Sequence, residues 1–211
     1  MNYVITIARG YGSGGKEIGE ALGKELGIPC YEQQILKMAS EYSGINEALF
    51  AKSDEKLKGS YLFNLLTKMQ TSVMAGPEDK EFASNDNLFR IQSHIINELA
   101  EKKSCIIIGK CADYVLKNKR NVLSIYVEAS REACLKRIMS KYDMTKEEAN
   151  KKIDKMEKYR YDYYRYYTGG DWRNPVNYHM VLNSGRLGKE GCVEIIRHAA
   201  EEKFIKTAKK P

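Results

Sequence analysis

The sequence has no long hydrophobic run. No apolar stretch approaches the ~18 consecutive residues that a membrane-spanning helix needs, and charged residues make up 30% of the 211 residues. A predicted strand begins at residue 3, so we expect no signal peptide in front of it. These absences predict a soluble, cytoplasmic protein without a membrane partner. Its length suits one core domain with an insertion, or two small domains.

Cysteine and histidine are too few and too scattered to suggest a disulfide framework or a zinc site. The five cysteines are odd in number and contain no C-x-x-C pair. The three histidines lie far apart and form no H-E-x-x-H pattern. We therefore expect buried thiols in a reducing compartment and incidental histidines. The residues concerned are Cys30, Cys105, Cys111, Cys134, Cys192, His94, His179 and His198.

A glycine-dense turn follows the first apolar run. Residues 3–8 predict a buried strand, and residues 10–16 fit the phosphate-loop pattern G-x-x-x-x-G-K. Glycines let several backbone N–H groups point into one concavity, and the helix predicted to follow adds its partly positive N-terminus. A tight turn that binds nothing is the alternative, but the strand–loop–helix context favours phosphate. The predicted nucleotide-binding residues are Gly10, Tyr11, Gly12, Ser13, Gly14, Gly15 and Lys16, and Lys16 is also the first catalytic cation.

Strands and helices alternate along most of the remaining chain, which is typical of an α/β sandwich with a mostly parallel sheet. One segment differs. Residues 45–83 contain no predicted strand, and their apolar spacing predicts helices over Asn46–Leu57 and Tyr61–Met74. We interpret this segment as a helical insertion and expect it to be mobile. The further strands are predicted at 28–31, 105–108, 122–127 and 178–182.

Several helix ends carry signals of their own. Gly27 is expected to end the helix that follows the loop. Ser130 can cap the helix after residues 122–127. Thr145 and Glu148 form a capping box, which opens a long helix towards Tyr167.

Five short motifs, spread over most of the chain, together carry a family resemblance. They are Ile5–Ile18, Leu26–Tyr31, Ile107–Tyr114, Tyr166–Trp172 and Leu182–Gly188. Each alone would be weak evidence. Together and in this order they resemble the bacterial cytidylate kinase-like family.

This resemblance implies the three-layer P-loop fold of the nucleoside monophosphate kinases. That fold has a five-stranded parallel sheet wrapped by helices, a helical monophosphate-binding insertion and a lid. A single kinase domain would span residues 1–211, with its core at about 1–44 and 84–211. The insertion would lie at about 45–83 and the lid at about 154–176. The family reaction would use ATP and Mg²⁺ to phosphorylate CMP, dCMP or a similar acceptor.

Phosphoryl transfer depends on positioning and charge neutralisation, so the site should collect cations around the phosphates. Arg137 and Lys141 lie four residues apart, on one helix face, and resemble the paired cations that face ATP. A solvated basic face, shared with Lys136, is the alternative. Among the cations of the lid-like stretch we select Arg160 as the catalytic one. Arg186, after the last strand, resembles the loop that borders the adenine.

Three further cations are candidates for the acceptor side. Lys110 matches a position at which the family usually has an arginine that contacts the acceptor phosphate. Lysine keeps the charge but loses the bidentate fork, so tight acceptor recognition is in question. A solvated lysine after a strand is the alternative. Lys37 and Arg90 lie in or beside the insertion, and either of them could simply be exposed.

The chain departs from the family pattern at its metal ligands. Glu17 and Ile18 follow the loop lysine, so the hydroxyl that usually binds magnesium is missing. The strand at 105–108 also ends without the acid that often steadies the metal. We hypothesise that Glu17 supports Mg²⁺, directly or through water. Alternatively, Glu17 binds no metal and only stabilises the helix, because a negative charge in the first turn interacts favourably with the helix dipole.

The net charge of +7 and a tyrosine–arginine stretch leave other functions open. Residues 159–167 hold six of the fifteen tyrosines, and aromatic side chains among basic residues can stack nucleic-acid bases. Six tyrosines on one helix surround every face, however. Packing under the lid or against another subunit of a homo-oligomer is therefore favoured over nucleic acid. A P-loop kinase for another small molecule and a nucleotide-binding regulatory protein without turnover are the remaining alternatives.

Overall fold

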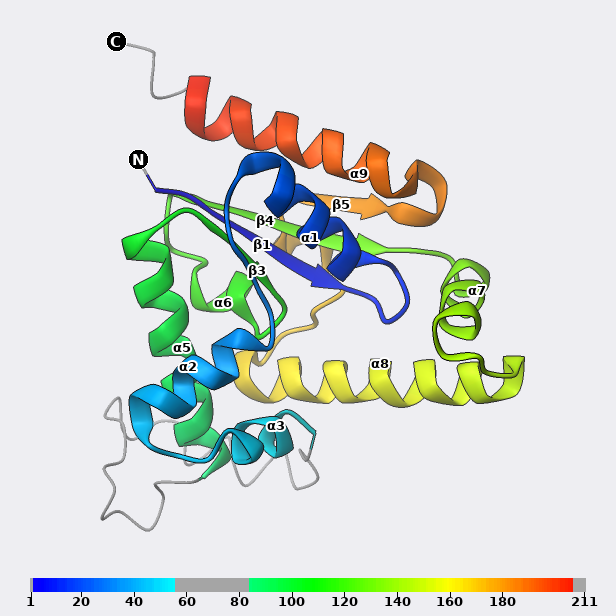
Figure 1. The fold of residues 1–211 in the computed structure, drawn as a ribbon, viewed down its shortest axis with the longest axis horizontal. Helices are drawn as coiled ribbons and strands as arrows, with labels where there is room; N and C mark the ends of the chain where they lie inside the picture. The colour runs from blue at the N-terminus through cyan, green and yellow to red at the C-terminus, as the bar shows by residue number, and fades with distance from the viewer. Residues whose placement is uncertain (1, 56–83, 207–211) are drawn as a thin grey trace.

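The computed structural model describes residues 2–55 and 84–206, and its centre is a five-stranded sheet. The strands are β1 (Val4–Arg9), β2 (Cys30–Tyr31), β3 (Cys105–Ile108), β4 (Val122–Glu128) and β5 (Met180–Asn183). They are all parallel and lie in the order β2-β3-β1-β4-β5 (Figure 1). The predicted parallel α/β architecture is confirmed.

Strand β1 lies in the middle of the sheet because it is apolar on both faces. Val4 belongs to one core cluster, whereas Ile5 and Ile7 belong to the cluster on the opposite face. Val4 pairs in register with Cys105 of β3 and with Val122 of β4. A strand covered on both faces in this way carries its carboxyl end, and the loop after it, to the edge of the sheet where ligands bind in open α/β folds.

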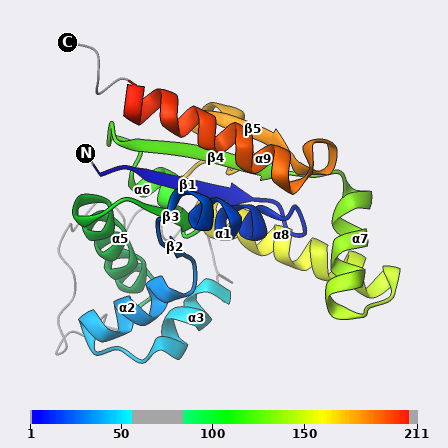
Figure 2. The same ribbon diagram turned by 45° about the horizontal axis from the view of Figure 1, so that its top comes forward.

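Helices α1 (Gly15–Leu26) and α9 (Ser184–Ala200) cover one face of the sheet (Figure 2). Helix α1 ends at Gly27, whose φ of 65° is left-handed and whose N–H donates to the Gly23 carbonyl. This confirms the predicted helix end. The last helix begins directly after β5, where the Asn183 side chain accepts hydrogen bonds from the Gly185 and Arg186 N–H groups, and Gly188 leaves helical geometry inside it. A short π-helix, η2 (Glu201–Lys206), follows.

The opposite face is covered by α2 (Gln34–Ser43), α5 (Asn85–Lys102) and the short α6 (Ala112–Val115). The apolar stripe of α5 packs with Ile107 and with Ile35 in one core cluster. Helix α3 (Glu47–Glu55) lies within the predicted helix Asn46–Leu57. The other predicted insertion helix, Tyr61–Met74, lies outside the described residues.

Two consecutive helices, α7 (Arg131–Tyr142) and α8 (Lys146–Thr168), follow β4. Ser130 caps α7, and Thr145 with Glu148 forms the predicted capping box of α8. Helix α8 is the long helix predicted to run from this capping box towards Tyr167, and it runs beneath the sheet in the view of Figure 1. Within the described parts of the chain, no helix is long and apolar enough to cross a membrane.

The tyrosines of α8 form a packed layer rather than an exposed platform. Tyr163, Tyr164 and Tyr167 are buried in one cluster with Trp172 and with Tyr126 of β4. The Tyr164 hydroxyl donates a hydrogen bond to a carboxylate of α6, and the Tyr167 hydroxyl donates to the Asn85 carbonyl of α5. The layer therefore fixes the second half of α8 against the core. Some of these tyrosines are thus packed against the core, and their place under a lid remains a prediction.

Candidate active site

A cavity of about 620 Å³ opens beside the loop that joins β1 to α1. The loop, the start of α1, the ends of β2 and β3, α7 and α8 all contribute to its wall. Residues that are distant in the sequence therefore meet at the carboxyl edge of the sheet. This is the position at which parallel α/β folds bind their ligands.

The phosphate loop has the backbone geometry that its glycines permit. Gly12 and Gly14 have φ values of 84° and 82°, which L residues with side chains rarely adopt. Gly15 lies so close to the Arg9 side chain that an added Cβ would approach Arg9 Cβ to 2.6 Å. The sharp turn and the close packing therefore require glycine at these positions. Helix α1 begins directly behind, so its N-terminus faces the loop.

Arg137 holds the loop from behind. Its Nη1 donates to the carbonyls of Gly12 at 3.2 Å and Ser13 at 2.8 Å, and also to Ser184 Oγ at 3.1 Å. Because the C=O and N–H of one peptide point in opposite directions, binding the Ser13 carbonyl turns the Gly14 N–H away from Arg137. Arg137 thus orders the loop and joins it to α9. It also lines the cavity, as its predicted role requires.

Lys16 reaches the cavity as an ion pair. Its Nζ lies 2.8 Å from Glu32 Oε2, and Glu32 Oε1 accepts a hydrogen bond of 2.7 Å from Arg9. Burial alone would raise the pKa of Glu32, but Arg9 and Lys16 together lower it, so the carboxylate is charged. The hydrogen bond and the charge of Glu32 raise the pKa of Lys16. The Glu32 carboxylate therefore bridges two cations beside the phosphate loop.

Lys110 lies in the same cavity on strained backbone. Lys110 and Cys111 have φ values of 58° and 52°, a conformation that costs on the order of 1 kcal/mol or more per residue. Burial, with the charge of Arg9 adding to it, lowers the pKa of Lys110 to about 7. The preceding Gly109, with a φ of 70°, leaves room for the Arg9 guanidinium, which a Cβ there would meet. Lys110 thus lies within the electrostatic reach of Arg9, and its role on the acceptor side remains a prediction.

Glu17 and Lys141 pair at the rim. Lys141 Nζ lies 2.7 Å from Glu17 Oε1, and the two side chains are 50% and 46% exposed. Burial alone would raise the pKa of Glu17, but the hydrogen bond from Lys141 lowers it overall. The described residues contain no group of three or more His, Cys, Asp or Glu side chains that could hold a metal ion by themselves. Magnesium at such a site would depend on nucleotide phosphates and on one or two carboxylates.

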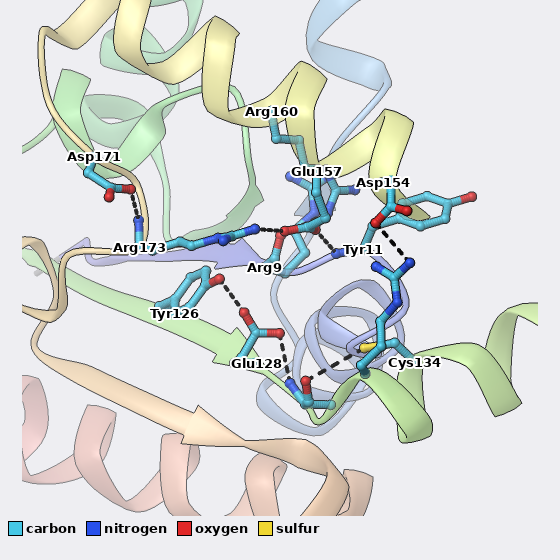
Figure 3. A network of polar contacts seen from close by, with 12 residues as sticks. Arg9, Tyr11, Tyr126, Glu128, Cys134, Asp154, Glu157, Arg160, Asp171 and Arg173 are labelled. Carbon is cyan, nitrogen blue, oxygen red and sulfur yellow. Dashed lines mark hydrogen bonds and ion pairs between the residues drawn. The ribbon is translucent and has the colours of Figure 1, made fainter. Parts of the chain in front are cut away.

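Arg160 connects α8 with the loop (Figure 3). Its Nη1 donates to the Arg9 carbonyl at 2.8 Å, and its guanidinium lies 5.3 Å from the centre of the Tyr11 ring. Burial lowers the pKa of Arg160 to about 9, which leaves it charged at neutral pH. On the same helix, Glu157 accepts a hydrogen bond from the Tyr11 N–H at 2.6 Å and pairs with Arg173 at 2.5 Å.

Three predicted site residues lie elsewhere. Lys37 is exposed on α2 and lies 3.8 Å from Glu41. Arg90 is half-buried on α5, and Arg186 is exposed in the first turn of α9 rather than in a loop. The described residues that line the cavity do not include these three. Their predicted roles in binding the acceptor and the adenine remain predictions.

Four charged residues of the site were not anticipated from the sequence. Arg9 and Glu32 directly follow the core of a predicted strand, so their position at the carboxyl edge of the sheet could have drawn attention to them. Glu157 and Arg173 carry no such signal. Glu157 is one of several acids on a charged helix, and Arg173 lies in an irregular loop, so only the tertiary structure brings them to the phosphate loop.

Comparisons with known proteins agree with this geometry. Residues 4–186 match the model of the cytidylate kinase-like family. A curated protein from Archaeoglobus fulgidus, named cytidylate kinase, is 30% identical over 149 residues, which are 67% of this chain and 80% of that protein. The family supports phosphoryl transfer to a small molecule.

Two solved structures share the fold. An uncharacterized protein from Eubacterium ventriosum superposes with a TM-score of 0.69 at 20% identity, over 95% of this chain and 99% of the other. Shikimate kinase from Bacteroides thetaiotaomicron superposes with a TM-score of 0.52 at 12% identity, over 94% and 98% of the two chains. At these identities the likeness shows a common fold and nothing about activity or acceptor.

Proposed function

This chain belongs to the cytidylate kinase-like family, and we propose that it transfers the γ-phosphoryl group of ATP to a pyrimidine nucleoside monophosphate, CMP or dCMP. One observation carries the proposal. The phosphate loop with Lys16 and Arg9, which share the Glu32 carboxylate, and a second group of cations, Lys110 and Arg160, line one cavity. A donor and an acceptor that both carry phosphate need cations on both sides. A neutral alcohol would need only one group.

The proposed mechanism assigns separate tasks to these residues. The N–H groups of residues 10–16 and Lys16 hold the phosphates of ATP, and Arg137 keeps the loop in its conformation through the Gly12 and Ser13 carbonyls. Lys141 assists on the ATP side. Lys110 binds the acceptor phosphate. Arg160 on α8 stabilises the charge that spreads over the transferred group, and α8 excludes water from it.

Lys37 and Arg90 on the acceptor side, and Arg186 beside the adenine, complete the proposed set. Because they lie outside the cavity lining, these contacts would need the ligand or a movement of α2, α5 or α9 to form. Mutating each of them in turn measures that contribution.

Magnesium fits the site through its carboxylates. Glu32 inside the cavity and Glu17 at its rim both present oxygen ligands beside Lys16. A bound Mg²⁺ would neutralise the charge of the nucleotide phosphates and orient them. Magnesium titrations of ATP binding with Glu17→Gln and Glu32→Gln separate the two. Loss of the residue that supports the metal raises the half-saturating Mg²⁺ concentration, and loss of the other leaves it unchanged.

A second function is a kinase for another small acceptor. It is motivated by Lys110, which stands at a position where the resemblance expects arginine. It is also motivated by Glu32, a charged carboxylate that could accept a hydrogen bond from an alcohol. A nucleotide-binding protein without turnover is the third reading, because the loop hydroxyl and the acid after β3 are absent from the sequence.

An ADP-release screen tests the proposal. The acceptors are CMP, dCMP, UMP, AMP and non-nucleotide alcohols, with Lys16→Met as the inactive variant. The matched control is Lys24→Met on the exposed last turn of the same helix. We expect release with CMP or dCMP that is lost in the Lys16 variant alone. Release only with an alcohol would establish the second function, and ATP binding without release would establish the third.

A further inference from the structure

Glu157 places a carboxylate against the phosphate loop. Its Oε1 accepts a hydrogen bond of 2.6 Å from the backbone N–H of Tyr11, the second residue of the loop motif. Its Oε2 lies 2.5 Å from Arg173 Nη2. The side chain is only 16% exposed. Figure 3 shows this carboxylate between Tyr11, Arg160 and Arg173, at the point where α8 meets the loop.

The surroundings of this carboxylate are those of an oxyanion site. A loop N–H donates to one oxygen and a guanidinium to the other, while the charge of Glu157 also acts on the neighbouring Arg160. Hydrogen bonds in which one partner is charged are about twice as strong as neutral ones. A phosphoryl group offers the same acceptor oxygens with more charge. The two anions cannot share the position, because like charges at contact distance repel strongly where burial limits screening by solvent.

We propose that this position is a phosphoryl subsite, formed by the Tyr11 N–H and Arg173, and that the Glu157 carboxylate is its internal occupant in the absence of nucleotide. A phosphoryl group of the bound nucleotide displaces the carboxylate and takes over both donors. The inference rests on the proposed function for the identity of the ligand. It adds Arg173 as a phosphate-binding residue and Glu157 as a competitor that the ligand must replace.

The backbone of Arg173 is held in place, whereas its side chain has room to bind a different anion. Its backbone N–H is anchored by Asp171 at 2.9 Å, and the preceding Trp172 is buried in the aromatic cluster of α8. Its side chain is nevertheless 52% exposed. The main chain is therefore held while the long side chain can follow a new anion. Glu157 lies on the same helix as Arg160, so its release leaves α8 held to the loop region by Arg160 alone among these two side chains.

Affinity for polyphosphates tests the competition. ATP and inorganic tripolyphosphate are titrated calorimetrically into the wild type, Glu157→Gln and Asp154→Asn. Asp154 lies three residues earlier on α8, pairs with Arg131 at 2.8 Å and is 71% exposed, so its variant removes the same charge away from the loop. Glu157→Gln should bind both ligands about tenfold more tightly than the wild type, because a neutral amide competes less well. Asp154→Asn should change affinity less than twofold.

A double variant tests the role of Arg173. Adding Arg173→Gln to Glu157→Gln should remove most of the gain, because the guanidinium no longer binds the phosphate. Glu157→Ala serves as a second single variant, and thermal melting of each protein verifies its fold. Equal affinities in Glu157→Gln and the wild type, or weaker binding in both Glu157 variants, would overturn the inference. In that case turnover with CMP by the wild type would leave the proposed function standing. Failure of every protein to bind ATP would overturn both.

Discussion

Lys16 Nζ and Glu32 Oε2 lie 2.8 Å apart, so the lysine of the phosphate loop is ion-paired with an acid from the end of β2. Glu32 also binds Arg9. The acid at the edge of the sheet thus comes from the strand next to β3, not from β3 itself, where the sequence has Lys110 and Cys111. One carboxylate keeps two cations close together before any phosphate arrives.

Removing this carboxylate should destabilise the protein at neutral pH. It should also make the free energy of unfolding depend less on pH in the acid range. Glu32→Gln leaves Lys16 and Arg9 facing each other, and we expect a loss of roughly 1–3 kcal/mol at pH 7. The folded protein lowers the pKa of Glu32, so its contribution is fully present above the unfolded value of about 4.5 and is lost progressively as pH falls from there through the lower pKa of the folded state. Urea unfolding at pH 7 and pH 4 measures this, with Glu20→Gln as the control, because Glu20 lies 3.9 Å from the same lysine at an exposed position. Equal losses at both pH values would contradict the ion pair.

Replacing Arg137 by lysine should loosen the phosphate loop. A lysine cannot reach Gly12, Ser13 and Ser184 at once, because it lacks the planar fork. We expect ATP to bind about tenfold more weakly and the unfolding free energy to fall by ~1–2 kcal/mol. Lys136→Met, at the exposed neighbouring position, should change neither. An Arg137→Lys protein with unaltered ATP affinity would show that the loop keeps its shape without this side chain.

Acceptor use should depend on the charge of Lys110. Its pKa is lowered to about 7, so the side chain is charged below pH 7 and increasingly neutral above it. We expect kcat/KM for CMP to fall as pH rises from 6 to 8. Lys110→Arg keeps its charge over this range, so its ratio to the wild type should rise with pH. This ratio cancels the titration of the CMP phosphate itself. A ratio that stays constant would exclude Lys110 from acceptor binding.

Replacing Gly109 by alanine should lower the unfolding free energy more than replacing Gly27, another glycine with a positive φ. Gly27 has a φ of 65° and no atom within 4 Å of an added Cβ, so Gly27→Ala should cost only the backbone strain, about 1 kcal/mol. At Gly109 the φ is 70° and the Arg9 guanidinium occupies the space. Gly109→Ala should therefore cost at least ~1 kcal/mol more, since Arg9 must also move from Glu32. Urea unfolding of both variants measures the difference, and equal losses would argue against the packing of Arg9 on Gly109.

Asp113 should make the protein less stable as pH rises. Burial raises the pKa of this α6 carboxyl from 3.8 to about 6, although the Tyr164 hydroxyl donates to it at 2.8 Å. The folded state thus holds a proton that the unfolded state has lost between about pH 4 and 6, and stability falls over that range. Asp113→Asn keeps an acceptor for Tyr164. It should raise the unfolding free energy by up to ~3 kcal/mol at pH 7.5, and by little at pH 4.

Asp143→Asn, at the exposed end of α7, is the control for that pH series, because it makes the same chemical change at a position open to solvent. The pH dependence of Asp113→Asn is measured against it. If Asp113→Asn changed the unfolding free energy equally at pH 4 and pH 7.5, ionisation of the Asp113 carboxyl would not destabilise the folded protein, and the prediction would be wrong.

The elements with local signals were predictable from the sequence. Gly27 ends α1, and the Thr145–Glu148 capping box opens α8, because both depend on residues within one turn of the helix. The tyrosines of α8 show where such reasoning stops. These tyrosines lie on all faces of the helix. Only the packing of α8 against Trp172 and Tyr126 decides which of them are buried.

The sequence by itself determined the parallel sheet and the phosphate loop, because apolar runs, glycines and a lysine express them at short range. The charge partners were decided by the tertiary structure. Glu32 reaches Lys16, and Glu157 reaches Tyr11 across 146 positions of the sequence, only after β2 and α8 have packed beside the loop. Acids and arginines are common on solvated faces, so nothing in their sequence neighbourhood distinguishes the few that pack beside the phosphate loop. The burial that lowers the pKa of Lys110 likewise arises only from packing.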